Sequence, residues 1–175
     1  TLAITGATTI SASGQDITLD EAASTFGTLA LTGANVAVTD AGATDLGAST
    51  VSGTLGITSA GAVTDSGTLA ITGATTISAS GQDITLDEAA STFGTLALTG
   101  ANVAITDAGA TDLGASTVSG TLGITSAGAV TDSGTLAISG VTTISASGQD
   151  ITLDEAASTF GTLALTGANV AVTDA

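Results

Sequence analysis

Large apolar residues recur at every second position in short stretches along the whole chain. Leu29 and Leu31 form one such stretch, and Val36 and Val38 form the next. This period of two, with β-branched residues inside and Gly, Asp and Ser at the boundaries, is typical of β-strands. The segment TLDEAAS, residues 18–24, has local helical propensity but is too short for a stable helix. We expect a strand end and a turn there.

The pattern is repeated almost without change. The phrase TLAITGATTISASGQDITLDEAASTF begins at Thr1 and returns at Thr68, and a variant of it begins at Thr135. The period is therefore 67 residues, and the chain divides into units 1–67, 68–134 and 135–175, the last of them partial. Nothing in the sequence lies outside these units, so we expect one continuous structure built from one element.

Many short strands in near-identical units predict an all-β parallel solenoid, also called a β-helix. A two-sheet sandwich is the competing interpretation, because regular short strands also suit that fold. The solenoid is favoured because stacking gives every unit the same environment, which a closed sandwich does not. Small residues also suit corners between coils that lie about 4.8 Å apart.

The size of one coil is less closely determined by the sequence. Three coils of about 22 residues per unit would give a three-sided solenoid, and five coils of about 13 would give a two-sided one. We favour the larger coil, and the crossover rule for parallel strands favours right-handed winding. Gly27 and its equivalents are expected at corners where a Cβ would be strained. Gly94→Val should therefore destabilise the centre of the stack.

The composition excludes several classes of function. The chain has no Lys, Arg, His or Cys, and its 16 acidic residues give a formal charge of −16. Binding to nucleic acid depends on cations that neutralise phosphates, so no nucleic-acid partner is expected. Catalytic triads, thiol nucleophiles and imidazole or thiolate metal sites are absent. The chain has no run of about 18 apolar residues, so we expect no insertion into a membrane.

Two longer phrases of the repeat are DITLDEAASTFGTLALTGANVAVTDA and LGASTVSGTLGITSAGAVTDSG. They resemble the repeat region of filamentous-haemagglutinin-like giant bacterial surface adhesins. The resemblance covers the whole chain and implies a β-helical stalk at the surface of a Gram-negative-type cell. It also implies a separate amino-terminal secretion domain, and adhesion to a host-cell or surface ligand, both through regions outside these 175 residues. No binding residue is carried over, because such repeats act as scaffold.

The acidic residues are the first candidates for a binding site. Asp16, Asp20 and Glu21 cluster in GQDITLDE, while Asp40 and Asp45 flank DAGATD. Carboxylates close together could hold calcium, which takes six to eight oxygen ligands. Neither phrase matches an EF-hand loop or the glycine-rich turns of calcium-binding β-rolls. We favour turn and edge residues that keep the rod soluble, and we predict no cofactor, with calcium as the alternative.

The regular threonines suggest a second candidate, an ice-binding face. A flat array of hydroxyls can order water, although Thr is also a good strand residue. The residues considered for this face are Thr8, Thr9, Thr28, Thr32, Thr54 and Thr58. One phenylalanine per unit, at Phe26, Phe93 and Phe160, is expected in the core rather than at a ligand.

The sequence therefore predicts a structural protein and not an enzyme. Glycoside hydrolysis would need a carboxylate pair in a cleft with aromatic or basic residues for the sugar, and these are missing. We assign no catalytic, cofactor-binding or metal-binding residue. The main hypothesis is an extracellular rod whose partners are neighbouring repeats along its axis. A small subunit that assembles into a filament is the alternative, and an ice- or calcium-binding solenoid is the weaker one.

Overall fold

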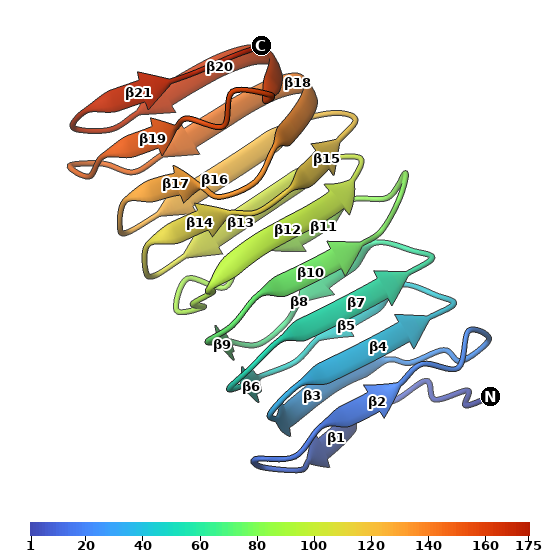
Figure 1. Ribbon diagram of the computed structural model, residues 1–175. Helices are drawn as coiled ribbons and strands as arrows, with labels where there is room; N and C mark the ends of the chain where they lie inside the picture. The colour runs from blue at the N-terminus through green and yellow to red at the C-terminus, as the bar shows by residue number, and fades with distance from the viewer.

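The computed structural model describes residues 1–175 and contains 21 strands and no helix (Figure 1). Every strand pairing is parallel, and each strand pairs with others about one turn away in sequence. The chain therefore winds into a β-solenoid of about eight turns, which confirms the fold predicted over the sandwich. Right-handed winding stays a prediction. No helix long and apolar enough to cross a membrane is present.

The strands form two stacks that run along the solenoid axis (Figure 1). The first stack contains β2 (Ile17–Leu19), β4 (Val36–Asp40), β7 (Leu55–Ser59), β10 (Thr75–Ser78), β12 (Thr95–Gly100), β14 (Thr111–Leu113), β15 (Ser116–Val118), β17 (Val130–Asp132), β19 (Ile151–Leu153) and β21 (Val170–Val172). The second stack contains β1 (Thr8–Ser11), β3 (Thr28–Gly33), β5 (Thr44–Leu46), β6 (Ser49–Val51), β8 (Val63–Asp65), β9 (Leu69–Ile71), β11 (Ile84–Leu86), β13 (Val103–Asp107) and β16 (Leu122–Ser126). Two longer strands, β18 (Leu136–Ser145) and β20 (Thr159–Thr166), begin in the first stack and end in the second.

One repeat does not make a whole number of turns. From β3, seven successive pairings in the second stack lead through β5, β8, β11, β13, β16 and β18 to β20. Thr28 in β3 and Thr162 in β20 are equivalent residues two repeats apart. Two repeats therefore make seven turns, and one repeat makes three and a half.

This result corrects the prediction of three coils per repeat. A typical offset between neighbouring turns is 19 residues, as between Asn35 and Thr54, so the coil is closer to the larger of the two predicted sizes. The half turn also moves each equivalent strand to the other stack. Strand β3 lies in the second stack, its equivalent β12 in the first, and the paired end of β20 in the second again.

The core is a continuous column of aliphatic side chains between the two stacks. Residues in register on successive turns point inward together, as do Ile17, Val36, Leu55, Thr75 and Leu96. In all, 33 buried hydrophobic residues form one cluster along the axis. Each fully buried large apolar side chain contributes about 1.5–3 kcal/mol, so this column can hold the coil together without disulfides.

The phenylalanines belong to this core, as predicted. Phe26 and Phe93 are buried in the aliphatic cluster, and Phe160 packs against it. The segment 18–24 is also as predicted, because β2 ends at Leu19 and a turn follows at Ala22 and Ala23.

Gly27 and its equivalents allow neighbouring turns to approach closely. A Cβ at Gly27 would lie 2.6 Å from the carbonyl oxygen of Gly6 and 2.7 Å from that of Thr5. A Cβ at Gly94 would meet the carbonyl oxygens of Thr72 and Gly73 in the same way. Neither glycine has a positive φ. The predicted strain at Gly27 is therefore steric and comes from the next turn, not from a left-handed backbone.

Candidate functional site

One set of carboxylates connects successive turns at a corner of the coil. Asp16 Oδ1 accepts hydrogen bonds from the side-chain amide of Asn35 at 2.9 Å and from its backbone N–H at 3.1 Å. Asn35 Oδ1 in turn accepts the N–H and the hydroxyl of Thr54 one turn further. Asp83 and Asn102 repeat this arrangement. The result is a polar ladder across three turns, and sequence reasoning missed the role of the asparagine.

A second set of carboxylates lies inside the coil. Asp40 and its equivalent Asp107 are each only 1% exposed. Asp107 Oδ1 accepts the Gly109 N–H at 2.8 Å, and Oδ2 accepts the Thr111 hydroxyl at 3.1 Å. The Ser126 hydroxyl lies 3.0 Å from that of Thr111. Each side-chain polar group of this cluster therefore has a partner, because Ser126 also donates to the Gly109 carbonyl. Burial raises the pKa of the Asp107 carboxyl above its usual value, against the hydrogen bonds that lower it.

The remaining partnered carboxylates cap turns near the surface. Asp45 Oδ2 accepts the hydroxyls of Thr28 at 2.7 Å and Ser66 at 2.8 Å. Asp65 accepts the backbone N–H groups of Asp87 and Glu88. Burial, and to a lesser degree the charges of Asp87 and Glu88, raise the pKa of Asp65.

The structure distributes the five calcium candidates over different places. Asp16 lies in the corner ladder, Asp40 is buried, and Asp45 bridges two turns. Asp20 and Glu21 lie in an exposed loop after β2. No three acidic side chains come together in a geometry suited to a metal ion. Asp16 and Asp45 instead accept hydrogen bonds from neighbouring turns, whereas Asp40 accepts them from Gly42 and Thr44 within its own turn.

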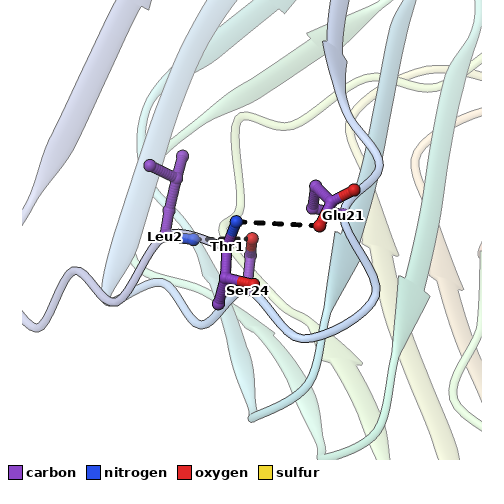
Figure 2. A network of polar contacts seen from close by, with 4 residues as sticks. All are labelled: Thr1, Leu2, Glu21 and Ser24. Atoms are coloured by element: carbon purple, nitrogen blue, oxygen red, sulfur yellow. Dashed lines mark hydrogen bonds and ion pairs between the residues drawn. The ribbon is translucent and has the colours of Figure 1, made fainter.

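The serine that follows each exposed loop accepts a hydrogen bond from the backbone of the preceding turn. Figure 2 shows the first copy of this contact, in which Ser24 Oγ accepts the N–H of Leu2 at 3.0 Å. Ser91 and Ser158 accept the N–H groups of Leu69 and Leu136 in the same way. Figure 2 also shows Glu21 at 3.6 Å from the Thr1 amino group. Both groups of this ion pair are exposed, so its contribution to stability is small.

The threonines considered for an ice-binding face do not form one array. Thr9, Thr28 and Thr32 lie in the second stack, whereas Thr54 and Thr58 lie in or beside the first. The hydroxyls of Thr28 and Thr54 are also engaged by Asp45 and Asn35.

One threonine in each repeat points inward and has no hydrogen-bond partner. The hydroxyls of Thr8, Thr75 and Thr142 are the three buried side-chain polar groups without a hydrogen-bond partner. Thr75 pairs with Leu55 on one turn and with Leu96 on the next, so its hydroxyl lies within an aliphatic row. Thr8 therefore cannot contribute its hydroxyl to a surface. The period of two places this position inside, but it gives no sign that the hydroxyl is unpaired.

The surface contains no pocket that would enclose a ligand. A family model described as repeats of unknown function (DUF5649) matches residues 1–32, 33–99 and 100–167. The chain belongs to this repeat family. The DUF5649 match from 33 to 99 has the same 67-residue length as the period read from the sequence, with a different starting point. A search of curated proteins found no match, and a search of solved structures found none.

Proposed function

We propose that this chain is a segment of an extracellular rod that gives reach and stiffness to a large bacterial surface protein. The observation that carries the proposal is the continuous hydrogen-bonded stack of turns built from near-identical repeats. In this role the chain is not an enzyme and needs no cofactor. Adhesion to a host cell or another surface belongs to other parts of the protein, as the resemblance to haemagglutinin-like adhesins implies.

Stiffness follows from bonds that run along the axis of the rod. The structure has 105 backbone hydrogen bonds, and they include the ladders that join each turn to the next. Bending the rod would stretch these ladders on one side and would open the aliphatic column beneath them. The corner ladder of Asp16, Asn35 and Thr54 adds side-chain bonds in the same direction. A stack of this kind lengthens by adding repeats without changing its cross-section.

The surface chemistry suits exposure outside the cell. The outward positions of the strands carry mostly small or hydroxyl residues, such as Ala37 in β4 and Thr58 in β7. The net charge of −16 makes rods repel one another, which opposes lateral aggregation. The chain also has no Lys or Arg, so trypsin-like proteases have no cleavage site on it.

Antibodies against the 175-residue chain test the location on cells that carry the gene. We expect labelling of intact cells, with a cytosolic protein labelled only after permeabilisation as the control. Labelling of the repeats only after permeabilisation would contradict the extracellular role. The mass of the labelled polypeptide under denaturing conditions distinguishes the two kinds of rod. A mass far above 16.2 kDa supports a covalent stalk, and a mass near 16.2 kDa supports the filament subunit instead.

A further inference from the structure

Each repeat carries an acidic loop that leaves the strand ladder. Between Ile84 and Ser91 the chain is two residues longer than the segment Val103 to Ala108 that covers it on the next turn. The extra length forms the loop 87–90, whose four residues are all exposed. The same sequence forms the loops 20–23 and 154–157 in the other repeats. These loops contain adjacent Asp and Glu residues and mark one position of each repeat along the rod.

The half turn in the repeat places these landmarks on opposite sides. Loop 20–23 follows β2, which lies in the first stack, and loop 87–90 follows β11 in the second. Loop 154–157 follows β19, which returns to the first stack.

We propose that the half-turn repeat makes the rod two-faced and that the number of repeats sets the direction in which later segments point. Each face presents a given loop once in every two repeats, or seven turns, which is about 34 Å at 4.8 Å per turn. Adding or removing one repeat rotates everything that follows by half a turn. Adding or removing two repeats restores the original direction. This inference rests on the strand register and does not depend on the extracellular role.

The half turn per repeat also affects any partner that recognises a feature of the repeat. Such a partner meets the feature on both faces of the rod, with successive copies displaced by half a turn. A solenoid with a whole number of turns per repeat would instead present all copies in one line. A two-faced rod can be bound from both sides, whereas a one-faced rod has a single binding edge.

Distances between spin labels test the alternation directly, because the chain has no native cysteine. The three double variants combine Ala22→Cys, Ala89→Cys and Ala156→Cys, one in each exposed loop. We expect the distance from 22 to 156 to be about 34 Å, from seven turns of 4.8 Å. The two distances to position 89 should each be at least about 20 Å, because they combine an axial rise of about 17 Å with the sheet separation of about 10 Å.

The three labels should therefore form a triangle. A distance from 22 to 156 equal to the sum of the other two would place the labels in one line and overturn the proposal. Ser13, Ser80 and Ser147 are exposed equivalents at another position of the repeat, and they provide a second set of labels if a loop variant does not fold. Inserting a further copy of residues 68–134 after Gly134 should move the last label to the opposite face, so that the inserted Ala89 equivalent and the last label again lie on different sides. An insertion that left the last label on its original face would also overturn the proposal.

Discussion

At the scale of single residues, the most unusual groups are the unpaired threonine hydroxyls in the aliphatic column. Thr75 and Thr142 are fully buried and have no acceptor for their hydroxyls. A buried hydroxyl without a hydrogen bond costs about 1–3 kcal/mol relative to one that is paired. The repeat thus contains one position at which the core is less stable than its shape would allow.

We expect Thr75→Val to raise the free energy of unfolding by about 1 kcal/mol, because valine has nearly the same shape and leaves no unpaired polar group. Thr76→Val is the matched control, since Thr76 is the next residue of the same strand and points outward. The control should change stability by less than about 0.5 kcal/mol. Denaturant unfolding measures both variants, and a Thr75→Val protein less stable than the parent would contradict the buried, unpaired hydroxyl.

Two carboxylates with raised pKa values predict that mild acid stabilises the protein. Burial raises the pKa of Asp65 and Asp107 in the folded state above the usual value of 3.8. Between 3.8 and these raised pKa values, the folded chain binds more protons than the unfolded chain. Stability therefore falls as pH rises through this window. We expect the melting temperature to increase when the pH is lowered from 7 toward 4, and the lower negative charge acts in the same direction.

Asp107→Asn separates the buried group from the general effect of charge. The substitution removes a carboxylate whose protonation stabilises the fold, so the melting temperature should depend less on pH between 4 and 7. Asp20→Asn removes the same charge from an exposed loop and serves as the control, with the pH dependence largely retained. Equal pH dependence in the two variants would show that the buried site has no special part in it.

At the scale of elements, neighbouring turns stack closely because the residues at their contact points are glycines, which have no side chain. Gly94→Ala places a Cβ against the backbone of Thr72 and Gly73, and the backbone cannot rotate aside as a side chain could. We expect a loss of about 2–3 kcal/mol of stability, in the range of overpacked cores. Gly123→Ala is the control, because its Cβ would meet nothing closer than 3.7 Å. Thermal melting that ranked the two variants equally would disprove the predicted approach of the turns.

The strands themselves were largely predictable from the sequence. The alternation at Leu29 and Leu31 identifies β3 and its inward face, because the period of two is a local property. The turn after Leu19 was likewise predictable from its short length and polar content. The exact repetition also favoured the stacked fold over the sandwich, since it requires the same environment for each unit.

The register of the turns was not predictable in the same way. Offsets between paired residues vary, from 17 residues for Thr28 and Asp45 to 22 for Leu69 and Ser91. Loops such as 87–90 absorb these differences, and no local pattern tells how many residues leave the ladder. The half turn per repeat follows only from the summed offsets, whereas the inward placement of Asp40 continues the alternation of Val36 and Val38. The candidate site was therefore predictable in its residue types but not in the grouping of those residues.

At the scale of the whole molecule, the half-turn solenoid is a rod whose length is proportional to the number of repeats. Each repeat of three and a half turns should add about 17 Å, given a spacing of 4.8 Å between strands. Three coils per repeat would add about 14 Å, and five small coils would add about 24 Å. A sandwich would grow in no single direction. The increment per repeat therefore distinguishes every fold that the sequence allowed.

The length of rods with different numbers of repeats is the sharpest test of the half-turn solenoid. A series of chains that carry additional copies of residues 68–134 can be imaged by electron microscopy, with ten added copies to enlarge the difference. We expect straight rods of constant width that lengthen by about 170 Å over the ten copies, from ten times three and a half turns of about 4.8 Å. An increase near 140 or 240 Å, or particles that thicken instead of lengthening, would contradict the half-turn solenoid.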